Sequence, residues 1–525
     1  MTRPRIRRAA AASAMAAALV ALLACSSEAL HAHEWPSPSP GGERSPQRPS
    51  PGAWSGMVWP GPQAGAPAAP SALNCARAPQ AFEIGAGAGW DQPRQVGLSR
   101  RTDRESRDSR DLRERAAEPA LGKSAAPATL AAPTPTPAPA TAAAPKMADA
   151  LRSRTELEAR KDLAPAAQAL PPTRPADEPV AAGVVDDNAD FGEYLAYVER
   201  NAHLPVRARD VRERYGLTVH DARGRPVPDA EVAVFAGREA LPLWARTDAA
   251  GRAWLHPRAA VPGLAASLLE VQVRDGRSGA RGSAILQRGQ KHALQVTLAD
   301  ARHAPPKPQL DIAFLIDATG SMGDEIDKLK RSMRAVAEQI ARLPSQPDVC
   351  YGLVAYRDRG DAFFVRGADF TNDLGAFQQQ LAQLRADGGG DTPEALNEAL
   401  HSAVHRLSWR GDGTARMILL VADAPPHLDY GAPYYDTDAT AALAKGIKLF
   451  AVGASGLDPV GEYVFRQAAQ YTGGRFVFLT YANARDPSSG PGRETPHDVR
   501  NYSVETLDAL VVRLVKEEMA AWPKA

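Results

Sequence analysis

Apolar positions along this chain follow two different periods. The stretch "YGLTVHDARGRPVPDAEVAVF" alternates apolar and polar residues on both sides of a turn rich in Gly, Pro and Asp. Alternation of this kind predicts strands, and about seven of them in roughly 90 residues favour a small β-sandwich. A short helix with Phe191, Leu195 and Val198 on one face is expected just before the strands. Residues 188–302 are therefore predicted to hold a lead-in helix and a β-sandwich.

Residues 308–525 show the second pattern. Continuous apolar runs such as "LDIAFLID", "ARMILLVAD" and "IKLFAVGA" alternate with amphipathic segments such as "DEIDKLKRSMRAVAEQIARL". Strands that are apolar throughout and separated by helices predict an α/β fold, with a doubly wound, mostly parallel, Rossmann-like sheet covered on both faces. Ligand sites in such sheets gather at the carboxyl ends of the strands.

Residues 26–187 keep no period that could build a core. Runs such as "EWPSPSPGGERSPQRPSPG" and "PATLAAPTPTPAPATAAAP" are rich in Pro, Ala and Ser, and they hold many of the chain's 45 prolines. Such composition favours extended, solvated backbone. We expect this segment to be a long disordered tether.

Residues 1–25 resemble the signal of a bacterial lipoprotein. Four arginines within the first eight residues precede an apolar run that ends in "LLAC". The resemblance implies that Cys25 is lipidated and anchors the protein to a membrane, and that Ser26 directs it to the outer membrane. We therefore expect an exported outer-membrane lipoprotein, facing the periplasm or the surface. An ordinary cleaved signal and an uncleaved Ala-rich anchor are the alternatives.

The net charge bears on the kind of partner, and the cysteine content bears on disulfide bonds. The formal net charge is +1, from 62 basic and 61 acidic residues, so no nucleic-acid partner is expected. Beyond Cys25 the chain has only Cys75, in the expected tether, and Cys350, in an expected strand. We expect no disulfide framework, and Cys350 is expected to be a small buried apolar residue.

Three segments place oxygen-bearing side chains at the ends of predicted strands or before predicted helices. They are "DATGS" after the first strand, "GGGDTPEAL" before a helix, and "VADAPPH" after a later strand, with the candidates Asp317, Thr319, Ser321, Asp391, Thr392 and Asp423. Carboxylates mixed with hydroxyls suit a hard divalent cation, Mg²⁺ first, with Mn²⁺ or Ca²⁺ as alternatives. Gly320 and the run 388–390 would let the backbone pass close to it. Taken singly, each motif is better explained by a helix cap or by the shape of a loop.

The order of these motifs resembles the von Willebrand factor A domain and its metal-ion-dependent adhesion site, whose first loop reads D-x-S/T-x-S. The resemblance covers about 310–522. It implies that Asp317, Thr319 and Ser321 form the first loop and that Asp423 lies on the third. For the second loop it leaves Asp391 and Thr392 both open. It also implies one free coordination position, which an acidic side chain of a partner fills.

Two neighbouring phrases add detail to this resemblance. "AYRD" also recurs in the family, and we expect Arg357 and Asp358 to pair structurally near the site. In the preceding segment, "GRPVPDAEV" and "TDAAGRA" resemble carboxypeptidase-regulatory-like and other immunoglobulin-like sandwiches, which indicates a fold and a spacer role but no activity.

Two further motifs have competing interpretations. "HLDYGAPYYD" places Tyr430, Tyr434 and Tyr435 beside Asp423, either as a binding patch or as packing of a long loop. His401 and His405 in "HSAVH" have the spacing of a zinc-binding pair. The glutamate of a metalloprotease is missing and no third ligand follows in the sequence, so a pair on the helix surface is favoured.

The sequence predicts a binding protein and not an enzyme. It contains no G-x-S-x-G elbow and no phosphate-binding G-x-x-x-x-G-K loop. We expect a metal-dependent binding or adhesion module that captures a protein, or an envelope or matrix component, with an exposed acidic group. The alternative is a periplasmic accessory protein that holds a partner enzyme or envelope complex. A metal-assisted hydrolase ranks third because no general base is evident beside the site.

Overall fold

The computed structural model describes Cys75, residues 78–86, 94–95, 179–299 apart from 292, and 307–522 apart from 412. The predicted lipoprotein signal at 1–25, with Cys25, and most of the predicted tether lie outside these residues. None of the helices in these ranges is long and apolar enough to cross a membrane.

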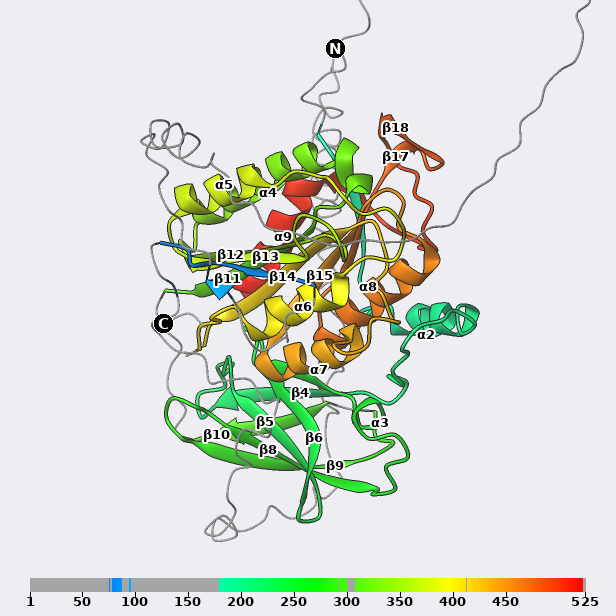
Figure 1. Cartoon of the computed structure of the whole chain (residues 1–525). Coiled ribbons are helices and arrows are strands. Elements are labelled where there is room, and N and C mark those ends of the chain that lie inside the picture. The colour runs from blue at the N-terminus through cyan, green and yellow to red at the C-terminus, as the bar shows by residue number, and fades with distance from the viewer. Residues whose placement is uncertain are drawn as a thin grey trace, which may run out of the picture. The chain divides into compact units, whose positions relative to one another are not determined.

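Ten strands of the described ranges form one sheet, in the order β19-β3-β16-β15-β14-β11-β12-β13-β1-β2 (Figure 1). Its centre is parallel and consists of β16 (Phe476–Leu479), β15 (Ile447–Gly453), β14 (Ala415–Ala422), β11 (Gln309–Asp317) and β12 (Asp348–Tyr356). The outer strands pair antiparallel with their neighbours: β13 (Val365–Thr371), β1 (Ala81–Ile84), β2 (Arg94–Gln95), β3 (Ala181–Val185) and β19 (Val504–Thr506). The predicted α/β fold with a parallel central sheet is confirmed.

Helices cover both faces of this sheet, which explains the unbroken apolar runs of its central strands. One face carries α4 (Ile326–Ala341), α5 (Leu374–Gln383) and α9 (Leu507–Ala520), and the other carries α6 (Leu396–His405), α7 (Tyr435–Lys445) and α8 (Pro459–Thr472) (Figure 1). Along β11, Ile312 and Phe314 enter the core beneath α4, whereas Ala313 and Leu315 enter the core beneath α6.

Seven strands between Tyr215 and Leu298 form two further sheets. One has the order β10-β4-β7 and the other β6-β5-β8-β9. The strands are β4 (Tyr215–Asp221), β5 (Glu231–Ala236), β6 (Glu239–Arg246), β7 (Arg252–Leu255), β8 (Leu268–Arg274), β9 (Arg281–Gln287) and β10 (Leu294–Leu298), with the short helix α3 (Pro257–Ala260) after β7. The strand number and the two-sheet arrangement agree with the predicted β-sandwich.

The lead-in helix is α2 (Phe191–Arg200), but its buried face differs from the predicted one. Tyr194 and Tyr197 are buried, whereas Phe191 and the other two predicted positions are only partly buried. Tyr197 packs against the ring of Tyr463 on α8, with 6.0 Å between ring centroids. The helix therefore docks on α8 through its tyrosines. Which of its faces is buried depends on the position of α8, and the sequence pattern of α2 alone does not show it.

The β-sandwich shares a hydrophobic core with the α/β domain. Buried polar groups cross the junction: Asp229, before β5, pairs with Arg416 on β14 at 2.9 Å. Lys448 on β15 pairs with Asp248 at 2.9 Å. Because these pairs are closely packed, the sandwich is docked on the domain and is not the separate spacer that the sequence suggested.

The predicted tether extends too far at two places. Ala81–Ile84 pairs with β13, and Ala181–Val185 pairs with both β16 and β19, so both segments of 26–187 belong to the sheet. The sequence could not show this, because four- and five-residue strands are too short to display a period. Such short strands are held by backbone hydrogen bonds to neighbours that are distant in the chain, such as β13 for β1 and β16 for β3.

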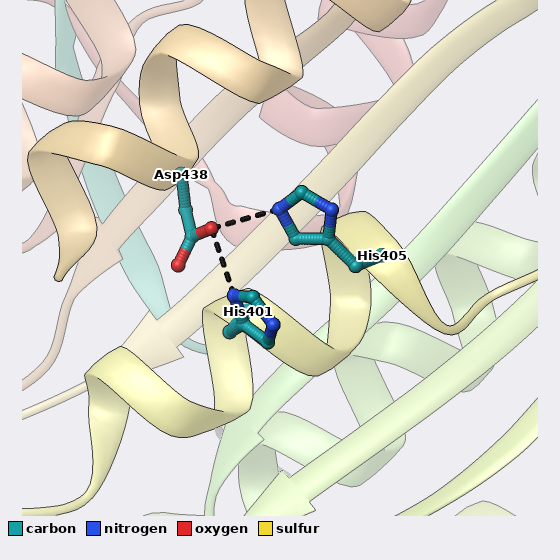
Figure 2. A group of neighbouring side chains, drawn as sticks. All are labelled: His401, His405 and Asp438. Carbon is teal, nitrogen blue, oxygen red and sulfur yellow. Dashed lines mark hydrogen bonds and ion pairs between the residues drawn. The ribbon is translucent and has the colours of Figure 1, made fainter. Parts of the chain in front are cut away.

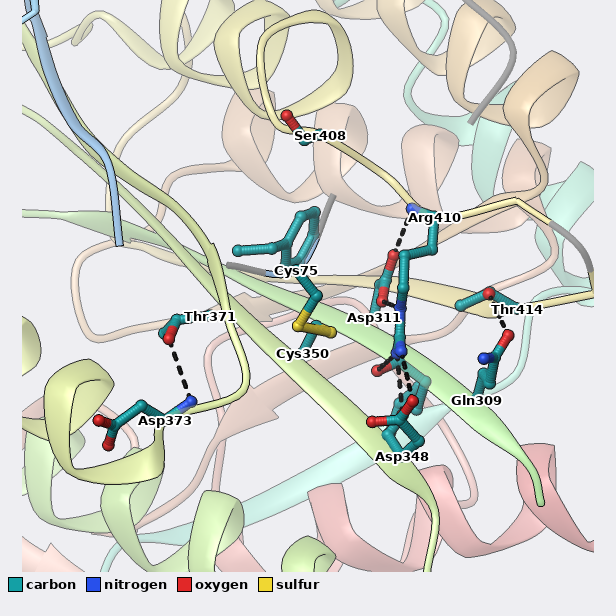
Figure 3. The surroundings of a disulfide bond; sticks show 12 residues. Cys75, Gln309, Asp311, Asp348, Cys350, Thr371, Asp373, Ser408, Arg410 and Thr414 are labelled. Carbon is teal, nitrogen blue, oxygen red and sulfur yellow. Dashed lines mark hydrogen bonds and ion pairs between the residues drawn. A yellow bond between two sulfur atoms is a disulfide. The ribbon is translucent and has the colours of Figure 1, made fainter. Parts of the chain in front are cut away.

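The structure also contradicts the prediction for the two described cysteines. Cys75 and Cys350 form a disulfide, with 6.0 Å between their Cα atoms and a sequence separation of 275 residues (Figure 3). Cys350 lies on β12 and Cys75 precedes β1. The disulfide therefore links the segment before β1 to a central strand of the sheet. Neither local composition nor spacing reveals such a partner, because only the packing of β1 beside β13 brings the two together.

Candidate metal centre

The first and third predicted loops meet because their strands are neighbours. Asp317 is the last residue of β11, and Asp423 directly follows β14. The two strands are parallel, with Ile316 opposite Val421, so both carboxylates emerge at the same edge. Strand β11 lies between β12 and β14, where the winding of the chain reverses, which is the usual place for a ligand site in such a sheet.

The side chains of the first loop form a tight cluster of oxygens. Asp317 Oδ1 accepts hydrogen bonds from the Thr319 backbone N–H (2.9 Å) and the Thr319 hydroxyl (2.6 Å). Thr319 Oγ1 lies 3.0 Å from Ser321 Oγ, and Ser321 also hydrogen-bonds Asp423. Asp317 and Thr319 are fully buried, and Ser321 is exposed. The structure thus gathers four of the six predicted donors.

The glycines hold the first loop against the second. The Gly320 N–H donates to the Gly388 carbonyl at 2.9 Å. A Cβ at position 320 would lie 2.8 Å from that same oxygen, and Gly388 adopts a φ of +74°. Side chains at these two positions would force the loops apart or strain the backbone, so glycine is required here.

The second loop presents its candidates differently from the first. Asp391 and Thr392 are both exposed, and within the described ranges no hydrogen bond joins either to the four gathered donors. Glu394 is buried instead, and a Cβ on Gly389 would lie 2.9 Å from its Oε1 and 3.2 Å from the Cβ of Thr319. Sequence reasoning missed Glu394, because a glutamate close to the start of a predicted helix is commonly there to interact with the helix N-terminus.

Three buried carboxyl groups lie close enough together here to raise one another's pKa. Burial, together with Asp423, raises the pKa of Asp317 to about 7. Burial and the charge of Glu325 raise the pKa of Asp423 to about 6, and burial with the charges of Asp317 and Asp358 raises that of Glu394 to about 9. Among the described residues no lysine, arginine or histidine pairs with any of the three.

Three oxygens of this cluster also lack a hydrogen-bond partner among the described residues, so the carboxyl groups need a proton or a positive charge from elsewhere. Asp317 Oδ2, Asp423 Oδ1 and Glu394 Oε2 are buried and have no hydrogen-bond partner in the described part of the chain. Buried carboxylates without a partner are costly, and they are stabilised by protons or by a bound cation. Because the donors are carboxylates and hydroxyls, the set fits a hard divalent cation such as Mg²⁺.

Arg357 and Asp358 support the site from separate positions. Arg357 donates to the Ala318 carbonyl at 3.1 Å and pairs with Asp387 at 3.4 Å, which braces the loop after Asp317. Asp358 accepts a hydrogen bond from the Tyr430 hydroxyl at 2.9 Å. Each residue therefore pairs near the site, but with a different partner.

The tyrosine-rich loop divides between the two interpretations offered for it. Tyr435 is fully buried and exchanges hydrogen bonds with the backbone of Arg207, so it is a packing residue. Tyr430 is half-buried, stacked on His427 at 3.7 Å between ring centroids. Tyr434 is also half-buried, beneath the Arg207 guanidinium. Only Tyr430 and Tyr434 keep accessible surface that a partner could contact.

Comparison with known proteins identifies this part of the chain. Residues 311–427 match the model of the von Willebrand factor A domain, and the match includes all three loops of the centre. The chain contains a von Willebrand factor A (VWA) domain. The rat von Willebrand factor A domain-containing protein 7 is similar to it, with 35% identity over 173 residues, which covers 33% of this chain and 16% of the relative.

More distant proteins match the VWA domain as well. The alpha-protein kinase vwkA of Dictyostelium discoideum is 28% identical over 124 residues, covering 22% of this chain and 19% of the relative. The chain thus spans less than a fifth of these curated relatives. A solved pilus adhesin, SpaC from Lactobacillus rhamnosus GG in an open conformation, covers 39% of this chain and 29% of its own, at 15% identity and a TM-score of 0.25. A similarity that low supports no argument about function.

Proposed function

We propose that the VWA domain binds a protein, or an envelope or matrix component, through a divalent cation held by Asp317, Thr319, Ser321 and Asp423. The observation that carries this proposal is the group of buried carboxyl oxygens without a partner at one sheet edge. Mg²⁺ is the first candidate, with Mn²⁺ and Ca²⁺ as alternatives, because every donor is an oxygen. When bound, the cation supplies a positive charge that attracts an acidic group of the partner.

The chain's own residues provide the remaining features of a binding surface. Ser321 is exposed beside the buried pair Asp317 and Thr319, so the site opens to the outside at this hydroxyl. Asp391 and Thr392 lie on the exposed second loop, and either one completes the donor set in this proposal. Aromatic surface at Tyr430 adds an apolar contact of the kind common in protein interfaces.

Binding, and not catalysis, is the proposed activity. Glu394 is the feature that would favour the alternative of a metal-assisted hydrolase, because it is an unpaired carboxyl group beside Thr319. Burial and the charges of Asp317 and Asp358 raise its pKa to about 9, so it would need a bound cation nearby before it could act as a general base near neutral pH.

A cation titration tests the centre directly. We expect full-length protein to bind Mn²⁺ in calorimetry, and Asp317→Ala and Asp423→Ala to weaken that binding at least tenfold, since even outer partners of a metal are worth about 10–100-fold. Glu239→Ala, which removes an exposed carboxylate on β6, is the matched control and should bind like wild type. Equal Mn²⁺ affinity in all four proteins would refute the site.

A capture experiment tests the role of the cation in recognition. Immobilised wild-type protein and Glu239→Ala should retain the same partners from an envelope extract with Mg²⁺ and lose them with chelator. Asp317→Ala should lose them in both conditions. Partners retained equally in every sample would show that capture does not depend on the cation.

We also propose that the protein is exported and anchored through a lipidated Cys25. The Cys75–Cys350 disulfide supports export, because such bonds persist in oxidising compartments and are rare in the cytosol. Cys25→Ser should move the protein from the membrane fraction to the soluble fraction after cell breakage. If Cys25→Ser stays in the membrane fraction, the anchor lies elsewhere.

A further inference from the structure

Two histidines on α6 and an aspartate on α7 form a second group of potential metal ligands (Figure 2). His401 and His405 lie one helical turn apart, with 4.4 Å between their ring centroids. Asp438 faces both rings from the neighbouring helix. The structure therefore supplies the third ligand that was missing from the "HSAVH" sequence motif.

The three side chains converge on a single point. Asp438 Oδ1 lies 3.0 Å from His401 Nδ1 and 2.9 Å from His405 Nε2. One potential ligand atom from each residue lies within 4.8 Å of the other two. Two neutral imidazoles and one carboxylate are a common ligand set for Zn²⁺, which needs its three protein ligands at about 2 Å from the ion.

The surroundings of Asp438 give an independent indication of a ligand. Its side chain is 3% exposed, and its Oδ2 is buried without a hydrogen-bond partner in the described part of the chain. The ammonium of Lys445, at the end of α7, donates a hydrogen bond to the Val404 carbonyl at 2.5 Å, and it interacts with Asp438 through its charge without a hydrogen bond between them. A buried carboxylate with one free oxygen and no hydrogen bond from a lysine or arginine among the described residues is poised to accept a cation.

Access to the group is one-sided. The side chains of His401 and His405 are 29% and 25% exposed, so the imidazoles border solvent while the carboxylate behind them does not. An ion held by these three ligands would be reached from the solvent side, past the two imidazoles, which would suit an open rather than a closed zinc site.

We propose that His401, His405 and Asp438 bind a borderline transition metal of the Zn²⁺ class, with one coordination position open to an external ligand. This site is separate from the oxygen-donor centre of the VWA domain, because it uses imidazole nitrogens and different residues. Hard cations such as Mg²⁺ favour the oxygen centre, whereas Zn²⁺ and Co²⁺ favour nitrogen ligands. The two sites can therefore be tested independently.

Visible absorption of Co²⁺ tests the proposal, because its intensity reports ligand number and type. Full-length protein with His31→Gln and His33→Gln, which removes a competing pair of histidines in the N-terminal segment, is titrated with Co²⁺ in excess Mg²⁺. We expect one bound Co²⁺ that Zn²⁺ displaces. His401→Gln or His405→Gln in that protein should weaken Co²⁺ binding at least about tenfold. His203→Gln, which changes an exposed histidine, is the matched control and should leave it unchanged.

Further variants separate this proposal from the oxygen-donor centre. Asp317→Ala should retain full Co²⁺ binding even where it loses Mn²⁺ binding. Asp438→Asn should also weaken Co²⁺ binding at least about tenfold. Circular dichroism of the metal-free variants checks that each is folded, and the two partly exposed histidines carry the test if Asp438→Asn is unstable. Co²⁺ affinity equal to wild type in both His401→Gln and His405→Gln would overturn the site. A Co²⁺ spectrum unchanged by added azide would overturn the open position.

Discussion

His256 offers a test of how the β-sandwich is docked on the VWA domain. The side chain is fully buried, and its ring stacks on that of Tyr471 on α8 with 4.7 Å between centroids. Neither ring nitrogen makes a hydrogen bond of normal geometry in the described part of the chain, although the backbone of Tyr471 approaches the ring closely enough to raise its pKa in part. Burial, together with the charge of Arg214, lowers the pKa of His256 from 6.5 to about 3. The folded protein therefore holds a neutral imidazole at the junction.

The lowered pKa makes the free energy of unfolding depend on pH. Below about pH 6.5 the unfolded chain takes up a proton that the folded protein does not bind, so stability is lost as the pH falls toward about 3. The difference between the two pKa values of His256, 6.5 unfolded and about 3 folded, corresponds to about 5 kcal/mol of unfolding free energy, at about 1.36 kcal/mol for each pH unit. About 2 kcal/mol of this is lost by pH 5. His256→Phe removes the titrating group and keeps an aromatic ring against Tyr471.

Urea denaturation of wild type and His256→Phe at pH 8 and pH 5 measures this effect. At pH 8 the variant should lie within about 1.5 kcal/mol of wild type, as for other swaps of similar volume. At pH 5 the variant should gain about 2 kcal/mol relative to wild type. His203→Gln is the control, because its side chain is exposed and it should keep the wild-type pH dependence. A wild type and a His256→Phe variant with parallel pH profiles would refute the burial of a neutral imidazole.

Three other substitutions test particular contacts. Asp229→Asn should destabilise the protein by about 3–5 kcal/mol in urea denaturation, because it leaves Arg416 buried without its charged partner at 2.9 Å; a loss below about 1 kcal/mol would argue against the pair. Cys75→Ser, at the partly buried partner, should cost about 2–5 kcal/mol in oxidised protein and little after reduction; equal stability when oxidised would exclude the disulfide. Gly320→Ala should weaken Mn²⁺ binding about tenfold or more in calorimetry, because its Cβ would lie 2.8 Å from the Gly388 carbonyl oxygen; unchanged affinity would contradict that close approach.

The sequence was sufficient for the features that depend on local pattern. The unbroken apolar run that ends at Asp317 and the run before Asp423 predicted parallel strands, and parallel neighbours bring their carboxyl ends to one edge. The seven strands of the β-sandwich followed in the same way from alternation and turn residues. These predictions needed only the spacing of apolar side chains along the chain and the positions of glycine and proline in the turns.

Other features required contacts between residues far apart in the chain. The Cys75–Cys350 disulfide spans 275 residues, and it exists because β1 lies against β13. Asp438 completes the histidine pair only because α6 and α7 pack side by side. A local period carries no information about such partners, because it shows which face of an element is buried and not what covers that face.

The candidate metal centre shows both kinds of information in one site. By itself, the sequence determined which loops carry oxygen donors, since residue type and strand order are written in the chain. Only the tertiary structure decided that Glu394 lies buried beside Thr319 while Asp391 and Thr392 are exposed. The direction of a loop side chain depends on what packs around the loop, and here that packing comes from the glycine contacts between two loops some 70 residues apart.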